Sequence, residues 1–141
     1  MSQTNRNLHR TFQLLYRWLP AVLWMLGIFY FSSKPTLPQA PGPWLDAALK
    51  KLAHIFEYST LYLLLVRSWR GHVLPRKALD VALWTAAAFA ASDELHQAFV
   101  PGRHCTLYDF LIDLSGVLLL WWLLRRGSRS GFRTGYNDLA E

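Results

Sequence analysis

Cysteine is almost absent from this 141-residue chain, which has only Cys105. A single cysteine excludes an intrachain disulfide framework and any zinc or iron–sulfur site built from several cysteines. Charged residues are also scarce, at 17%, whereas 52% of the residues are hydrophobic and 15% are aromatic. This composition excludes an intrinsically disordered protein and leaves room for about one domain.

Acidic residues are outnumbered by basic ones, with nine aspartates and glutamates against fifteen lysines and arginines. In a soluble chain such an excess suggests nucleic-acid binding. No DNA- or RNA-binding motif accompanies it, and the basic residues lie beside long apolar segments. We therefore expect no nucleic-acid partner. The positions of the basic residues are instead used to predict the membrane topology.

Four apolar segments predict an all-α, polytopic membrane protein with four transmembrane helices. They occupy about residues 14–33, 50–67, 78–100 and 106–124, so residues 1–124 form one predicted membrane domain. The alternative is a small soluble helical bundle. Runs such as LYLLLV and GVLLLWWLL are apolar on every side, and a chain of this length has too little other protein to bury four such helices. We therefore expect lipid around them.

Prolines and glycines separate the apolar segments. Residues 34–43 read KPTLPQAPGP and cannot be helical, and the connection at Pro101-Gly102 is so short that the third and fourth helices must be antiparallel neighbours. The tail at 125–141 is rich in glycine and arginine and is predicted to be disordered and cytoplasmic. The first apolar run exceeds a signal-peptide core, so we expect it to be retained.

The basic residues are distributed unequally between the two sides that four spans would create. Eleven of the fifteen lie in the N-terminal segment, in the connection between the second and third spans, or in the tail, all of which share one side. The positive-inside rule therefore places both termini in the cytoplasm. The basic tail is suited to contact anionic membrane lipids. No feature of the sequence sets an oligomeric state.

With this topology, ionisable and polar residues collect at the outer ends of the second, third and fourth spans. Three pairs of them are spaced four residues apart, so that each pair lies on one helix face: His54 with Tyr58, Asp93 with Gln97, and Asp109 with Asp113. Exposure of charged groups to lipid is costly. The three faces should therefore converge on a polar pocket near the outer leaflet.

The first functional hypothesis is an enzyme that acts at this pocket. Five carboxyl groups are candidate general acids or bases, namely Glu57, Asp93, Glu94, Asp109 and Asp113. Four residues are candidates for substrate binding, namely Lys51, Tyr58, Gln97 and Arg103. A divalent metal held by His54, Glu57 and Glu94 is a further option, but it is not favoured because the chain has no contiguous motif such as H-E-x-x-H.

Two non-catalytic hypotheses stay open beside the enzyme. In one, the pocket binds or shields an amphipathic ligand, such as a lipoglycopeptide or a polyprenyl-linked precursor, without turnover. In the other, Lys51 and Arg103 neutralise three acids in ion pairs that only hold the outer loops. These acids are Asp93, Glu94 and Asp109.

Four neighbouring residues have structural interpretations. His96 follows Glu94 by two positions and should face elsewhere on its helix. Gly116 should allow a neighbouring helix to approach closely. Ser32 and Ser33 should end the first span, at a position from which they can line the pocket.

The residues of this pocket lie in strings that resemble the VanZ-like family. The strings are FYFSS at 29–33, Lys51-x-x-His54-x-x-Glu57-Tyr58, SDELHQAFVPGR at 92–103, and Asp109-x-x-x-Asp113-x-x-Gly116. The resemblance covers about Phe29 to Gly116 and implies a multi-pass protein of the bacterial cytoplasmic membrane. The family is named for a teicoplanin-resistance protein, so the resemblance also implies a link to the cell envelope and to antibiotic resistance. It implies no particular molecular activity.

Overall fold

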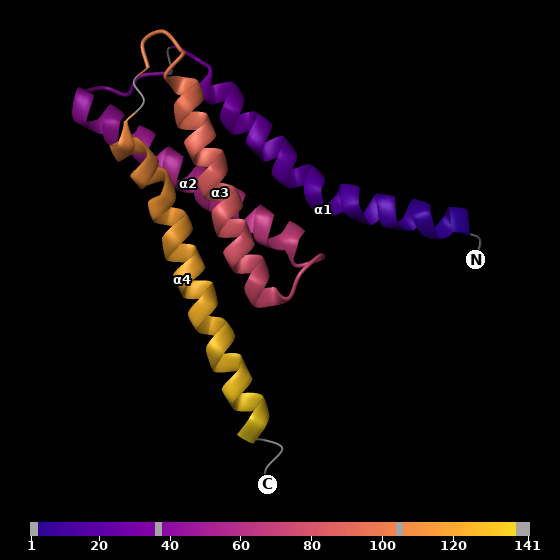
Figure 1. Ribbon diagram of the computed structural model, residues 1–141. Coiled ribbons are helices and arrows are strands. Elements are labelled where there is room, and N and C mark those ends of the chain that lie inside the picture. The colour runs from indigo at the N-terminus through magenta and orange to yellow at the C-terminus, as the bar shows by residue number, and fades with distance from the viewer. Residues whose placement is uncertain (1–2, 36–37, 104–105, 138–141) are drawn as a thin grey trace.

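The structure, a computed structural model, describes residues 3–35, 38–103 and 106–137. It contains the helices α1 (Gln3–Ser32), α2 (Pro43–Trp69), α3 (Pro75–Gln97) and α4 (Leu107–Asn137). Within these ranges no strand occurs, so the prediction of an all-α fold is confirmed. The ends of α1 and α3 lie at the same end of the bundle as the beginnings of α2 and α4 (Figure 1).

Prolines set three of the helix boundaries. Pro43 and Pro75 begin α2 and α3, where the missing N–H group has no helical partner to lose. The third helix ends at Gln97 rather than at the predicted residue 100. Pro101 accounts for this difference, because a proline disfavours helical backbone in the residue before it.

Two helices are longer than the sequence pattern predicts. α1 begins at Gln3 rather than near residue 14, and α4 continues to Asn137 through the tail that was expected to be disordered. Each residue added to an existing helix gains a hydrogen bond, so polar residues can extend it. The extension of α4 is also held at its start by the ion pair between Arg125 and Asp80, at 2.6 Å.

Pro20 lies inside α1 and exposes backbone acceptors to α2. Because proline has no N–H group, the carbonyl of Tyr16, four residues earlier, lacks its helical donor. Arg67 Nη2 donates to that carbonyl oxygen at 3.1 Å, and Ser68 Oγ donates to the carbonyl oxygen of Arg17 at 2.8 Å. These hydrogen bonds to carbonyl groups near Pro20 therefore join α1 to the end of α2.

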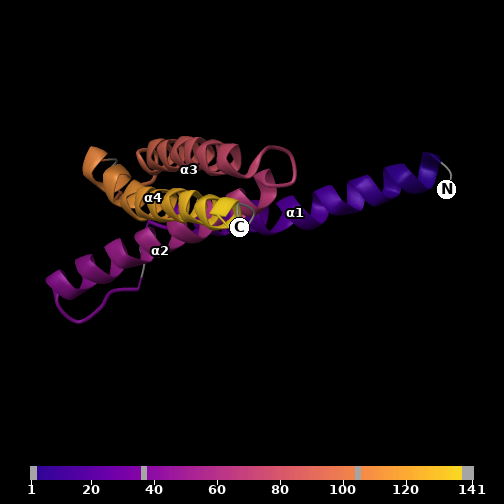
Figure 2. The ribbon, with the colours of Figure 1, turned by 90° about the horizontal axis from the view of Figure 1, so that it is seen from below.

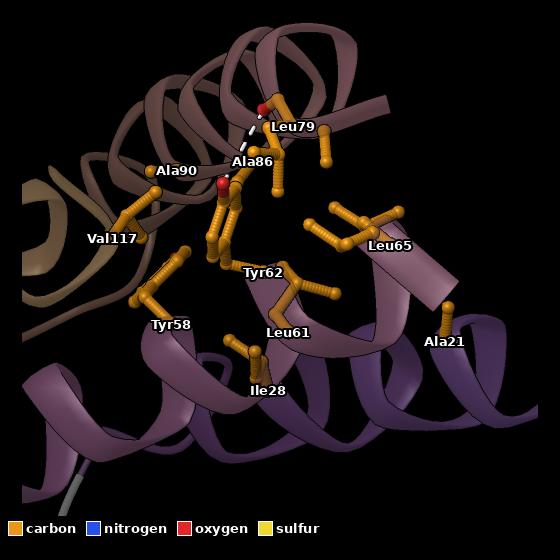
Figure 3. Close-up of a cluster of buried hydrophobic side chains, with 12 residues drawn as sticks. Ala21, Ile28, Tyr58, Leu61, Tyr62, Leu65, Leu79, Ala86, Ala90 and Val117 are labelled. Carbon is orange, nitrogen blue, oxygen red and sulfur yellow. Dashed lines mark hydrogen bonds between the residues drawn. The ribbon is translucent and has the colours of Figure 1, made fainter. Parts of the chain in front are cut away.

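The core lies around α2, which contacts the three other helices. Its buried face contains Tyr58, Leu61, Tyr62 and Leu65, spaced as one stripe of a helix. α3 presents an alanine at every fourth position, Ala78, Ala82, Ala86 and Ala90, which lets the two helices pack closely. Tyr62 reaches α3 and donates to the carbonyl oxygen of Leu79 at 3.4 Å (Figure 3).

The outer surface of the bundle is strongly apolar. The segments Thr11–Ser32 and Leu107–Gly127 are long and apolar enough to cross a membrane, and only 11% and 17% of them are buried inside the structure. A core helix of a soluble protein would be mostly buried. α3 and α4 pack beside α2, whereas the first half of α1 extends away from the bundle (Figure 2). This exposure favours lipid as the surrounding of α1 and α4.

Gly116 lies where α4 crosses α2. A Cβ atom built on it would collide with Ser59 Oγ and would lie 2.9 Å from Ile55 Cγ2 and 3.1 Å from the Ile55 carbonyl oxygen. The predicted packing role of Gly116 is therefore confirmed. The close approach matters for the site, because Asp113 lies one turn earlier on α4.

Replacing Gly116 by alanine should push α4 away from α2 and destabilise the protein by roughly 1–3 kcal/mol, the usual range for overpacking. The check is the melting temperature in detergent. Gly127→Ala is the matched control, because no described atom lies within 4 Å of a Cβ atom at that position of the same helix. Equal melting temperatures for the two variants would contradict the packing role.

Candidate functional site

A cavity of about 430 Å³ lies at the end of the bundle where α1 and α3 end and α2 and α4 begin. Nine of the ten candidate residues line it, namely Lys51, His54, Glu57, Asp93, Glu94, Gln97, Arg103, Asp109 and Asp113. The tenth, Tyr58, is fully buried and reaches the cavity wall through a hydrogen bond to Asp93. We call this space the polar cavity.

Asp93 is the centre of a hydrogen-bond chain along one wall. Its Oδ2 atom accepts from the hydroxyl of Tyr58 and from Nε2 of Gln97, both at 3.1 Å. Gln97 Oε1 in turn accepts from Nη1 of Arg103 at 3.2 Å. The chain joins α2, α3 and the connection to α4.

Arg103 extends this chain to α1. Its Nε atom donates to the carbonyl oxygen of Lys34 at 3.2 Å, and its Nη2 atom donates to that of Phe31 at 3.3 Å. Carbonyl groups at a helix end lack helical partners, and a planar guanidinium can serve several of them at once. Gly102 precedes it with a φ of 81°, a conformation that favours glycine. Arg103 therefore closes the wall between α1 and α3.

The ion pairs expected from a purely structural cluster are not formed. Among the described residues, Arg103 and Lys51 pair with none of the three acids named for them. Lys51 Nζ lies 3.5 Å from the hydroxyl of Tyr108 and 4.5 Å from the centre of its ring. The reason is that Arg103 is committed to uncharged oxygens and Lys51 to an aromatic face.

His54 and Asp113 form a close pair across α2 and α4. His54 Nδ1 lies 3.0 Å from Asp113 Oδ1. The Asp113 side chain is almost fully buried, whereas that of His54 is 24% exposed. A buried carboxylate of this kind orients an imidazole ring and fixes its tautomer, which is the arrangement of an acid–base pair.

Asp109 and Glu94 hold the beginning of α4. The hydroxyl of Thr106 donates to the Asp109 carboxylate, and the Asp109 N–H donates to Thr106 Oγ1 at 3.1 Å. Glu94 Oε2 accepts from the N–H of Thr106 at 3.4 Å. Helix capping thus accounts for Asp109. The Thr-x-x-Asp spacing at 106–109 is a capping signal that can be read from the sequence.

Four buried oxygen atoms of cavity-lining residues have no hydrogen-bond partner among the residues that the structure describes. They are Ser32 Oγ, Asp93 Oδ1, Glu94 Oε1 and Asp113 Oδ2. These four residues are at most 5% exposed. An unsatisfied buried polar group costs roughly 1–3 kcal/mol, and more when it is charged. All four belong to residues that line the polar cavity.

The predicted metal ligands do not come together as a metal site. In the part of the chain that the structure describes, no three His, Cys, Asp or Glu side chains are placed to hold a metal ion. His54 is engaged with Asp113, and Glu94 with Thr106. The set of His54, Glu57 and Glu94 therefore gains no support from the geometry.

Near the end of α1, Ser32 lines the cavity and His96 of α3 packs outside it. His96 faces away from the cavity, as predicted, because it stacks on Phe29 with ring centres 4.2 Å apart and its Nε2 lies 3.1 Å from Ser33 Oγ. Of the two serines expected to be able to line the pocket, Ser32 lines the cavity and Ser33 does not; neither was among the ten candidates. The position of Ser32 at the end of the first apolar segment was the available signal. His104 and Cys105 lie outside the described residues.

Comparison with known proteins identifies one family. A model of the VanZ/LLP1 family matches residues 2–128, a range that contains every residue lining the polar cavity. No curated protein and no solved structure matches the chain.

Arg103→Lys should remove the bridge between α1 and α3, because a lysine cannot reach three separate acceptors with a planar fork. We expect a loss of roughly 1–3 kcal/mol, measured as a lower melting temperature in detergent. Arg126→Lys is the control, since Arg126 is exposed and lies over the ring of Trp122. If Arg103→Lys has the same melting temperature as the wild type, the hydrogen bonds of Arg103 do not stabilise the cavity wall.

Proposed function

Because this chain belongs to the VanZ/LLP1 family, we propose that it is a multi-pass protein of the bacterial cytoplasmic membrane that binds the polar head of a cell-envelope amphiphile. All four helices cross the membrane in this proposal, and both termini lie in the cytoplasm. The polar cavity then opens toward the outer leaflet. Lipoglycopeptides and polyprenyl-linked precursors are amphiphiles of the proposed class.

Aromatic and basic residues at the other end of the bundle support this orientation. Trp18 packs edge-to-face on Trp69 with ring centres 5.1 Å apart, and its Nε1 donates to Nε2 of His72 at 3.1 Å. Arg126 lies 3.8 Å from the ring centre of Trp122. Tryptophan gathers at membrane interfaces, and arginine gathers on the cytoplasmic side.

The single native cysteine allows a direct test of topology. Cys105 falls between α3 and α4 in the sequence, so the proposal predicts that a membrane-impermeant maleimide labels it in intact spheroplasts. In a Cys105→Ser background, Leu74→Cys places the thiol in the exposed connection between α2 and α3. That variant should be labelled only after the membrane is permeabilised. The reverse pattern would invert the proposed orientation.

The observation that carries the binding proposal is the set of four unpartnered buried oxygens around the polar cavity. A protein that keeps such groups buried without partners loses stability, whereas a bound head group satisfies them. Phe31 also lines the cavity and is 54% exposed, so an apolar chain can continue from the cavity onto the outer surface. The site thus suits a molecule with a polar head and an apolar tail.

A second candidate function is acid–base chemistry on the bound molecule. The observation that favours it is the pair of His54 and Asp113, in which a buried carboxylate orients a partly exposed imidazole at the cavity. Glu57 lies one helical turn from His54 and also lines the cavity. The pair would act as a general base or acid toward the bound molecule.

Ala53→Trp tests the binding proposal without changing a polar residue. Ala53 is exposed and lines the cavity, so an indole there should occupy the cavity while leaving the core intact. Native mass spectrometry of protein extracted in mild detergent should show a co-purified amphiphile on the wild type, at about tenfold lower occupancy on Ala53→Trp. Leu63→Trp, at another exposed position of α2, should keep the wild-type occupancy. Equal occupancy of all three proteins would argue against binding in the cavity.

A further inference from the structure

We propose that the polar cavity selects amphiphiles whose head carries a protonated amine. This inference rests on the proposed function and names the chemical class of its ligand. It follows from three features of the cavity, namely its hydrogen-bonding groups, its charge and the geometry of its acids.

The hydrogen-bonding groups call for a donor. Three of the four unpartnered oxygens belong to the carboxyl groups of Asp93, Glu94 and Asp113. An ionised carboxylate accepts hydrogen bonds and donates none, whereas a primary ammonium group carries three N–H donors and accepts none. An ammonium head therefore supplies what these oxygens lack, and a phosphate or carboxylate head supplies more acceptors.

The charge of the cavity calls for a cation. Five acids line it, together with His54 and the three cations Lys50, Lys51 and Arg103. His54 pairs with Asp113, which leaves Asp93 and Glu94 among the buried acids to be matched. Each cation is engaged elsewhere: Lys50 with Asp46 at 2.6 Å, Lys51 with Tyr108, and Arg103 with Gln97 and two carbonyl oxygens. Among the described residues no cation pairs with Asp93 or Glu94, and buried charge without a counter-charge is costly. A cationic ligand completes the cavity, and an anionic head would meet the same acids as like charges.

The geometry of the acids favours an ammonium group over a metal ion. Metal ions require several oxygen ligands converging at about 2.0–2.6 Å. In the described part of the chain no group of three potential ligands meets this need. Hydrogen bonds from an ammonium group are longer, at about 2.7–3.2 Å, and each donor can reach a separate acceptor. Dispersed carboxylates therefore suit an amine better.

The test uses a series of probes with one apolar chain and different heads, added to the purified full-length protein in a non-ionic detergent. Isothermal titration should show saturable binding of octylammonium, about tenfold tighter than that of the neutral octanol, because buried charge-assisted hydrogen bonds are strong. Octanoate and magnesium chloride should give no saturable binding. Trimethyloctylammonium has the charge without the N–H donors and should also bind about tenfold more weakly than octylammonium.

Two variants locate the preference in the cavity. Asp93→Asn combined with Glu94→Gln keeps the shapes of both side chains and should bring octylammonium and octanol to similar affinity. Asp80→Asn is the control, because Asp80 contacts Trp121 and Arg125 and does not line the cavity. It should keep the wild-type preference. The probe series on the wild type stands alone if the double variant does not fold.

The outcomes separate this inference from the proposed function. Octanol or trimethyloctylammonium binding as tightly as octylammonium, with loss of binding in Ala53→Trp, would overturn the amine preference and leave the proposed function standing. Magnesium that displaces octylammonium would replace the amine by a metal ion. Absence of saturable binding for every amphiphilic probe would count against the proposed function itself.

Discussion

The site depends on the hydrogen bonds that the carboxyl group of Asp93 accepts. One of its oxygens accepts hydrogen bonds from Tyr58 and Gln97. Gln97 in turn accepts from Arg103, which also donates to a carbonyl oxygen at the end of α1. The other oxygen of Asp93 is buried and has no partner within the described part of the chain. The same residue thus fixes the relative positions of α1, α2 and α3 and leaves negative charge in the cavity between them. One buried acid therefore builds the wall and, in the proposed function, also offers an acceptor to the bound molecule.

The polar residues of the cavity have different physical roles. Tyr58, Gln97 and Arg103 form the wall, and Asp109 caps α4 through Thr106. His54 and Asp113 form a pair across α2 and α4, one turn from the close contact at Gly116. Three acids have one hydrogen-bonded carboxyl oxygen and one without a partner among the described residues, namely Asp93, Glu94 and Asp113. Loss of function in an acid variant therefore needs a measure of folding beside it.

Much of the fold was predictable because helices follow local rules. Prolines mark where α2 and α3 begin, and four-residue spacing indicates which polar residues share a face. The partners of individual side chains were not predictable, because they depend on groups that only the packed chain presents. Arg103 binds carbonyls at the end of α1 rather than Asp93, and Arg67 binds the carbonyl that Pro20 leaves without its helical donor. The charge pattern alone suggests that these arginines pair with acids, whereas in the structure they donate to backbone carbonyl oxygens.

The central claim is that the buried acids of the polar cavity are completed by a bound molecule. The most direct measurement is a high-resolution structure of the full chain in lipid nanodiscs prepared from its own membranes. The account predicts an extended density that enters the cavity and lies within hydrogen-bonding distance of Asp93 Oδ1, Glu94 Oε1 and Asp113 Oδ2. A cavity closed by Lys51 or Arg103, with either side chain paired to these carboxylates, would contradict it.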